Sequence, residues 1–173
     1  MNNFVICAYK QVGKTTLVKK LIENTNKDVC GLLTTKLTML QKEDALCPVY
    51  IYPVTEKPVY DEDHLIGYCG AGKHYTNPEV FDSLGLKYLE IKGSQPLVII
   101  DEIGFLEADA KKFQEKIFEL LDSDIPVVLT IKQRQDIDFI NRIKAYPDKE
   151  YFEMTEENRD EIFKIIKEKI DLL

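Results

Sequence analysis

Short apolar runs alternate along the chain with longer stretches in which apolar residues recur every three or four positions. Phe4-Val5-Ile6-Cys7 and Leu97-Val98-Ile99-Ile100 are continuous apolar runs, which are typical of strands buried on both faces of a sheet. A helical pattern begins at Lys14 and fades near Asn24. Its apolar face is formed by Leu17, Val18, Leu21 and Ile22.

The same criteria divide the rest of the chain. Further strands are expected at 29–35, 47–54 and 126–131, with shorter ones at 58–60 and 151–152. Further helices are expected at 79–91, 110–121, 136–145 and 156–172. The segment 41–44 is predicted to be a polar turn, and the glycine-bearing segment 61–78, which has no clear period, an irregular loop.

Alternation of strands with helices of this length indicates an α/β domain, in which a mainly parallel sheet is covered on both faces. The 173 residues, of which 45% are hydrophobic, can form one well-buried core and are too few for two comfortable domains. We therefore expect a single domain over residues 1–173.

Charge and composition narrow the function classes. The 30 acidic and 23 basic side chains give a net charge of -7, which disfavours nucleic acid as a partner but leaves a small anion such as a nucleotide possible. Cys7, Cys30, Cys47 and Cys69 are too far apart in the sequence for a CxxC metal motif, and we interpret them as reduced thiols. No apolar run is long enough to cross a membrane, so we expect a cytoplasmic protein, and we expect a monomer.

The segment between the first strand and the first helix ends in Gly13-Lys14-Thr15, the GK[ST] end of a phosphate-binding P-loop. The first turn of a helix presents free N–H groups and the positive end of the helix dipole to an anion. In this interpretation, Gly13 lets the backbone approach phosphate, Lys14 contacts the β- and γ-phosphates, and the Thr15 hydroxyl is a ligand of Mg²⁺. The residues expected to cradle the phosphates are Ala8, Tyr9, Lys10, Gln11, Val12, Gly13, Lys14, Thr15 and Thr16.

Two positions of this loop depart from the usual pattern. Ala8 replaces the first glycine of GxxxxGK[ST], and Gln11 stands where many such loops have another glycine. If either position requires a positive φ, a residue other than glycine costs about 1 kcal/mol or more. Lys10 adds a cation near the cradle, either as a phosphate contact or as a solvated surface lysine.

A second signal is the acidic pair that ends the apolar run 97–100. Ligands of open α/β sheets bind at the carboxyl ends of the strands, so Asp101 and Glu102 should emerge beside the phosphate loop. Asp101 would then hold Mg²⁺ together with Thr15, and Glu102 would position or deprotonate the attacking water. The alternative is that these acids only end a strand and begin a turn. Glu107, further along, is either a supporting acid or a solvated residue.

Phosphoryl transfer also needs a cation against the charge that develops on the transferred group. Arg134, Arg142 and Arg159 are the arginines of the chain. Arg134 follows the strand 126–131 at the expected ligand edge and is therefore our candidate for an internal arginine finger. Arg159 begins the last helix and is the weaker candidate, because acids flank it.

Several motifs together resemble one family. The stretches 12–20 (VGKTTLVKK), 101–107 (DEIGFLE), Lys112-Phe113 and 155–160 (TEENRD) are similar, in order and spacing, to the small nucleoside-triphosphatases that include the human cancer-related nucleoside-triphosphatase. The resemblance implies a three-layer αβα P-loop domain with a RecA-like sheet, and hydrolysis of ATP, GTP and other triphosphates with little base preference. It also implies that Arg134 is the arginine common after the family's penultimate long strand. The second nucleotide-binding stretch that it implies is Asp101, Glu102, Ile103, Gly104, Phe105, Leu106, Glu107 and Ala108.

The hypothesis from the sequence is Mg²⁺-dependent hydrolysis of a nucleoside 5'-triphosphate to diphosphate and phosphate. Its catalytic residues are Lys14, Glu102 and Arg134, and its metal ligands are Thr15 and Asp101. Two alternatives stay open: a nucleotide-binding regulatory or adaptor module without useful hydrolysis, and a kinase for a nucleoside or small molecule, with the segment 61–78 as a lid or acceptor site.

Overall fold

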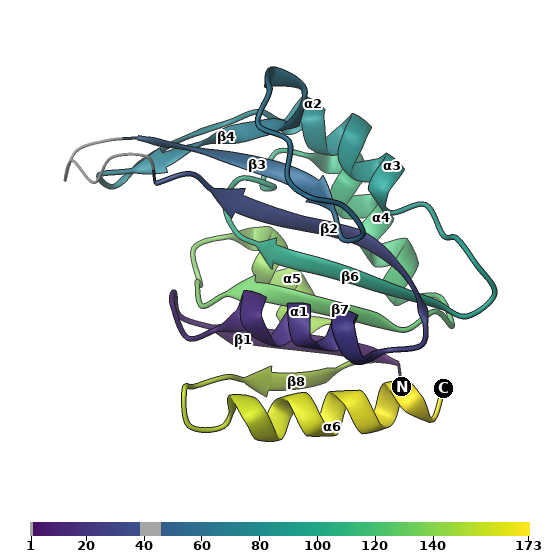
Figure 1. The fold of residues 1–173 in the computed structure, drawn as a ribbon. Helices are drawn as coiled ribbons and strands as arrows, with labels where there is room; N and C mark the ends of the chain where they lie inside the picture. Colours follow the sequence, from purple (N-terminus) through teal and green to yellow (C-terminus); the bar gives the residue numbers. More distant parts are fainter. Residues whose placement is uncertain (1, 39–45) are drawn as a thin grey trace.

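A computed structural model describes residues 2–38 and 46–173, which form an eight-stranded sheet with helices on both faces (Figure 1). The strand order is β5-β4-β3-β2-β6-β7-β1-β8. The parallel strands are β2 (Asp28–Lys36), β6 (Pro96–Ile103), β7 (Val127–Lys132), β1 (Asn3–Ala8) and β8 (Glu150–Glu153). The antiparallel strands are β3 (Cys47–Pro53), β4 (Leu65–Gly70) and β5 (Lys73–Thr76). The expectation of a mainly parallel sheet is confirmed.

Two apolar cores lie on the two faces of the sheet. Helices α1 (Lys14–Asn24) and α6 (Arg159–Asp171) pack together over one core. The other core contains α4 (Lys111–Leu121), α5 (Asp138–Ala145) and the helical segment formed by α2 (Pro78–Val80), η2 (Phe81–Gly85) and α3 (Leu86–Tyr88). Alternate residues of β6 enter opposite cores, Val98 and Ile100 one and Leu97 and Ile99 the other, so a continuous apolar run is what this strand requires.

The structure corrects two predicted segments. Residues 58–60 form no strand, and 61–78 is not an irregular loop but contains η1 (Glu62–His64) followed by the β4–β5 hairpin. The hairpin turns through Ala71 and Gly72, both with a positive φ. Its strands lie at the sheet edge with several exposed side chains, so they lack the apolar pattern that reveals a buried strand. The predicted turn 41–44 lies outside the described residues.

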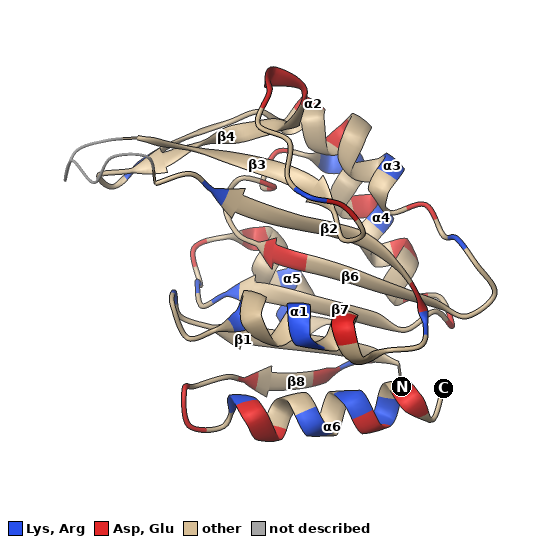
Figure 2. Cartoon of the chain, viewed as in Figure 1, with Lys and Arg blue, Asp and Glu red and all other residues tan. Residues whose placement is uncertain are grey.

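The fold brings polar strand ends to one edge. Because parallel strands end on the same side of a sheet, the carboxyl ends of β1, β2, β6 and β7 meet there, beside the start of α1 (Figure 1). In Figure 2 the acidic end of β6 lies among the basic ends of β2 and β7. Among the described residues, no helix has the length and apolar character needed to span a membrane.

Candidate active site

The loop between β1 and α1 has the backbone of a phosphate loop. Gly13 caps α1 with φ 101°, a left-handed conformation that favours glycine. A Cβ there would also lie 3.3 Å from a guanidinium nitrogen of Arg159, so the start of α6 closes over this loop. Gln11 adopts φ 64°, which costs a non-glycine residue roughly 1–2 kcal/mol, whereas Ala8 is simply the last residue of β1. Of the two departures from the glycine pattern, strain falls on Gln11 alone.

Lys14 is almost fully buried, with 5% of the residue exposed. Its Nζ donates hydrogen bonds to the carbonyl oxygens of Ala8 and Tyr9, each at 2.9 Å, and lies 3.0 Å from Oε2 of Glu102. A lysine ammonium has three N–H donors, so these three contacts satisfy it. The loop thus folds around its own lysine, and the Glu102 carboxylate occupies the side on which an anionic ligand would be recognised.

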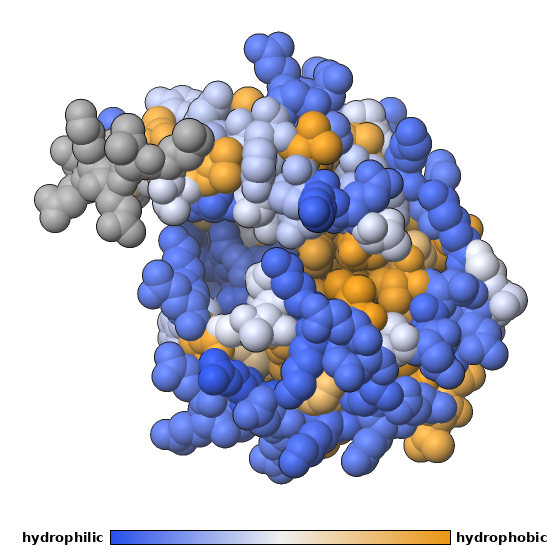
Figure 3. All heavy atoms as spheres, in the orientation of Figure 1, coloured by the Kyte–Doolittle hydropathy of each residue, from blue (hydrophilic) through white to orange (hydrophobic). Residues whose placement is uncertain are grey.

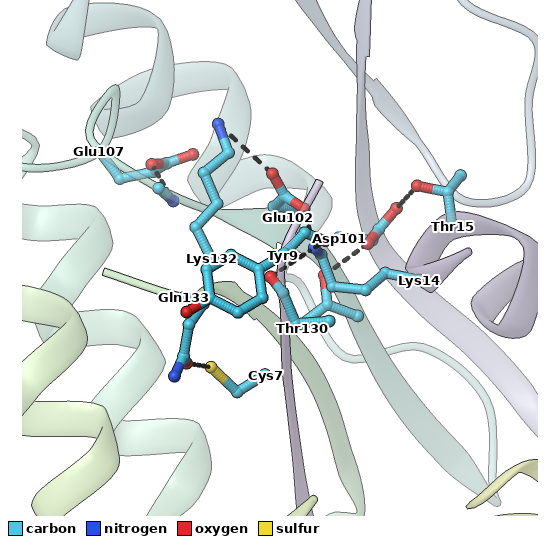
Figure 4. Close-up of polar contacts among 12 residues, drawn as sticks. Cys7, Tyr9, Lys14, Thr15, Asp101, Glu102, Glu107, Thr130, Lys132 and Gln133 are labelled. Carbon is cyan, nitrogen blue, oxygen red and sulfur yellow. Dashed lines mark hydrogen bonds and ion pairs between the residues drawn. The ribbon is translucent and has the colours of Figure 1, made fainter. Parts of the chain in front are cut away.

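Asp101 joins the acidic strand end to α1. Its side chain is fully buried and accepts hydrogen bonds from the Thr15 hydroxyl, at 2.7 Å, and from the Thr130 hydroxyl of β7 (Figure 4). Burial raises the pKa of Asp101, while the two hydroxyl hydrogen bonds act in the opposite direction. Asp101 and Thr15, which are 86 positions apart in the sequence, are therefore in direct contact, as their predicted common role requires.

Glu102 lies between two lysines. Its Oε2 contacts Lys14, and its Oε1 lies 3.3 Å from Nζ of Lys132, the last residue of β7. The sequence interpretation missed both Lys132 and Thr130. The available signal was a threonine near the end of the otherwise apolar stretch 126–131 and a lysine directly after it, which is the same kind of signal that identified Asp101 and Glu102.

The structure does not bring Arg134 to this group. Arg134 lies two residues beyond the end of β7, where its Nε donates to Oδ1 of Asp136 at 2.7 Å and its side chain is 43% exposed. Strand β7 ends at Lys132, so this lysine, and not Arg134, contacts Glu102, and the role of Arg134 as an arginine finger stays a prediction. The other candidate cation is Arg159, and its guanidinium lies against the phosphate loop at Gly13.

A cavity of about 390 Å³ opens beside these residues. Figure 3 shows the molecule hollowed on this side, with hydrophilic residues around much of the opening. The lining residues are Lys10, Gln11, Thr15, Thr34, Lys36, Thr38, Val49, Ile66, Cys69, Glu102, Gly104, Leu106, Glu107 and Lys132. The hydroxyl, carboxylates and lysines gathered here can bind an anion and a divalent cation together.

The two predicted nucleotide-binding stretches contribute unevenly to this cavity. Of the loop residues, Lys10, Gln11 and Thr15 line the cavity. Tyr9 and Thr16 are exposed to solvent outside it, and Val12 packs against the apolar core. From the second stretch, Glu102, Gly104, Leu106 and Glu107 line it. Ile103 is fully buried in the core, and Phe105 and Ala108 line a separate cavity of about 530 Å³.

Glu107 supports the turn that follows β6. It is buried, with 2% of the residue exposed, and its Oε2 accepts a hydrogen bond of 2.8 Å from the backbone N–H of Gly104. Burial raises the pKa of Glu107 to about 7, although the hydrogen bond from Gly104 lowers it. Glu107 is therefore not a solvated surface residue but a supporting acid inside the cavity wall.

The raised pKa of Glu107 makes the unfolding free energy depend on pH. The folded protein keeps this proton up to about pH 7, whereas the unfolded chain releases it near the ordinary value of 4.5, so stability falls as the pH rises between these values. Glu107→Gln stays neutral and keeps an acceptor for Gly104. We expect this variant to be more stable than the wild type at pH 8, by on the order of 2–3 kcal/mol, and nearly equal at pH 4.5. Urea unfolding at both pH values measures this; a pH-independent difference contradicts it.

The histidines take no part in this site. Nδ1 of His64 pairs with Asp61 at 2.5 Å, and the ring of His74 packs 4.5 Å from that of Phe105. Within residues 2–38 and 46–173, no group of three or more His, Cys, Asp or Glu side chains is arranged to hold a metal ion.

Comparison with known proteins identifies relatives along most of the chain. The chain is 29% identical over 169 residues to nucleoside-triphosphatase THEP1 of Aquifex aeolicus, covering 94% of this chain and 95% of that protein. It is 33% identical over 159 residues to nucleoside-triphosphatase THEP1 of Thermotoga petrophila, covering 90% and 85%.

Solved structures share the fold. The crystal structure of the Aquifex aeolicus THEP1 superposes with a TM-score of 0.76 at 28% identity, covering 95% of this chain and 96% of that one. The solution structure of a human cancer-related nucleoside triphosphatase has a TM-score of 0.75 at 18% identity, covering 99% and 98%, and at that identity it bears on the fold alone. A family model described as NTPase matches residues 3–167, so the chain belongs to the NTPase family.

Proposed function

We propose that this protein hydrolyses nucleoside 5'-triphosphates, ATP and GTP among them, to diphosphate and phosphate in a Mg²⁺-dependent reaction. The observation that carries the proposal is that Asp101 contacts Thr15 and Lys14 contacts Glu102, directly behind the cavity that Thr15 and Glu102 line. Relatives named nucleoside-triphosphatase that align over most of their length support the reaction class. From the sequence, we further propose that the protein is a cytoplasmic monomer and does not bind nucleic acid.

Lys14 and the loop amides would bind the phosphates. The N-terminus of α1 presents free N–H groups, and Gly13 leaves room for the phosphates to approach them. The Lys14 ammonium, now held by two carbonyl oxygens and Glu102, would transfer its contacts to the β- and γ-phosphate oxygens. This exchange replaces one anionic partner by another and leaves no buried charge unpaired.

The donor set at Thr15 and Asp101 fits Mg²⁺. A hydroxyl and a carboxylate in contact are hard oxygen ligands, and Asp101 is held in place by Thr130 from the neighbouring strand. When bound, Mg²⁺ would supply neutralisation of the charge on the β- and γ-phosphate oxygens. Glu102, the acid next in sequence, would orient the attacking water and accept its proton.

Phosphate release from ATP, GTP, CTP and UTP, each with MgCl₂ or with EDTA, tests this proposal. We expect release from all four triphosphates in Mg²⁺, because no base-reading motif is evident in the sequence, and a fall of at least tenfold in EDTA. Release that is unaffected by EDTA would remove Mg²⁺ from the proposal. Tight binding of a nonhydrolysable triphosphate with release no faster than the buffer blank would instead support the adaptor alternative.

A further inference from the structure

Glu102 makes the same kind of contact with two lysines from different elements. Its two carboxylate oxygens lie 3.0 Å from Lys14 Nζ and 3.3 Å from Lys132 Nζ, so one anionic group bridges two cations. Figure 4 shows the side chains of Lys132 and Glu102 pointing toward each other at the end of β6, with Lys14 on the other side of the carboxylate. Paired cations separated by a single carboxylate form a site of the right charge for a terminal phosphate group.

We propose that Lys132 is a catalytic residue, which binds the terminal phosphate opposite Lys14 and stabilises the charge that develops on it during transfer. The inference rests on the proposed hydrolysis and adds a residue to it. Without nucleotide, the Glu102 carboxylate holds the position between the two lysines; with triphosphate bound, the lysines turn to phosphate oxygens and Glu102 is freed to act on water.

The surroundings of Lys132 fix its stem in one direction. A Cβ at Gly104 would lie 3.0 Å from Cδ of Lys132 and 3.1 Å from its Nζ, so the lysine side chain passes closely over this glycine. On another side, Nζ lies 4.7 Å from the centre of the Phe105 ring, a cation–π distance. The side chain is 20% exposed, which limits competition from water. A lysine held in this way is preorganised to meet a developing negative charge.

The proposed chemical step needs no reactant other than water and the triphosphate. The oxygen of water forms a bond to the γ-phosphorus, and the bond from that phosphorus to the bridging oxygen breaks, so the diphosphate leaves with the electron pair. The proton of the water passes to the Glu102 carboxylate. During this exchange negative charge is spread over the other γ-phosphate oxygens, and the Lys132 ammonium would donate a hydrogen bond to one of them.

Lys132→Met tests the inference directly. We expect kcat to fall about 100-fold while KM changes less than threefold, because the contact matters most in the transition state. Lys132→Arg keeps a cation and should retain at least a tenth of the wild-type kcat. Lys19→Met, which removes an exposed cation of α1, is the matched control and should stay within threefold of the wild type, and Arg134→Met is measured beside it as the test of the predicted arginine finger.

A transition-state mimic separates this role from a structural one. A nucleoside diphosphate with aluminium fluoride should bind about 100-fold more weakly to Lys132→Met than to the wild type. The nucleoside diphosphate alone should bind to both proteins with affinities that agree within threefold. Equal losses for both ligands, or a wild-type kcat in Lys132→Met, would overturn the proposal, as would a loss confined to Arg134→Met. If Lys132→Met does not fold by circular dichroism, Lys132→Gln takes its place. Wild-type protein that releases no phosphate would refute the hydrolysis itself, which is a different result.

Discussion

Lys14→Ala is expected to abolish nucleotide binding and phosphate release together. The Lys14 ammonium is buried at the start of α1 and is the cation that both the loop carbonyl oxygens and Glu102 surround. Its loss removes charge-assisted hydrogen bonds to two phosphate groups, so we expect affinity for a nonhydrolysable triphosphate to fall at least about 100-fold and turnover at least about 1,000-fold.

Calorimetric titration and a phosphate-release assay measure these two losses. Lys19→Ala is the matched control, because Lys19 lies on the same helix with an exposed side chain and should leave both quantities near the wild type. Circular dichroism shows whether Lys14→Ala keeps its fold. A folded Lys14→Ala protein with wild-type affinity would mean that the nucleotide binds away from the phosphate loop, and the site described above would have to be abandoned.

Glu102→Gln should separate binding from turnover. A glutamine amide cannot accept the proton of the attacking water, so we expect kcat to fall by about 1,000-fold. The carboxylate of Glu102 also competes with phosphate for Lys14 and Lys132, and the neutral amide competes less. Affinity for a nonhydrolysable triphosphate should therefore equal or exceed that of the wild type.

Single-turnover phosphate release and calorimetric titration test both parts of this prediction. Glu157→Gln, in the exposed segment before α6, removes the same charge away from the site and should change neither quantity. Hydrolysis at the wild-type rate in Glu102→Gln would show that another group activates water. Much weaker binding would show that Glu102 supports the loop instead of competing with the ligand.

The centre of the site could be predicted from the sequence because its residues end strands with a strong apolar pattern. Gly13, Lys14 and Thr15 follow β1, and Asp101 and Glu102 close β6, so the rule that parallel strands end at one edge was enough to bring them together. The contact between Thr15 and Asp101 at 2.7 Å agrees with that reasoning. Local pattern and sheet topology determine these positions jointly.

The rest depended on information that local pattern does not carry. Lys132 and Arg134 are two residues apart at the same strand end, and only the exact end of β7 decides which of them faces Glu102. A strand boundary cannot be read from a pattern to within one or two residues. The β4–β5 hairpin was missed for another reason: its exposed edge position removes the apolar alternation by which strands are recognised.

The sheet order has a consequence for how the protein matures during synthesis. Strand β7 lies between β1 and β6, so the two segments that carry the phosphate loop and the acidic pair are joined by a strand that is made after both of them. A ribosome that has released residues 1–121 has therefore delivered nearly every catalytic group but not the partner strand that aligns them. The nascent chain should therefore gain the ability to bind nucleotide late and abruptly, once residues 127–132 emerge and insert between β1 and β6.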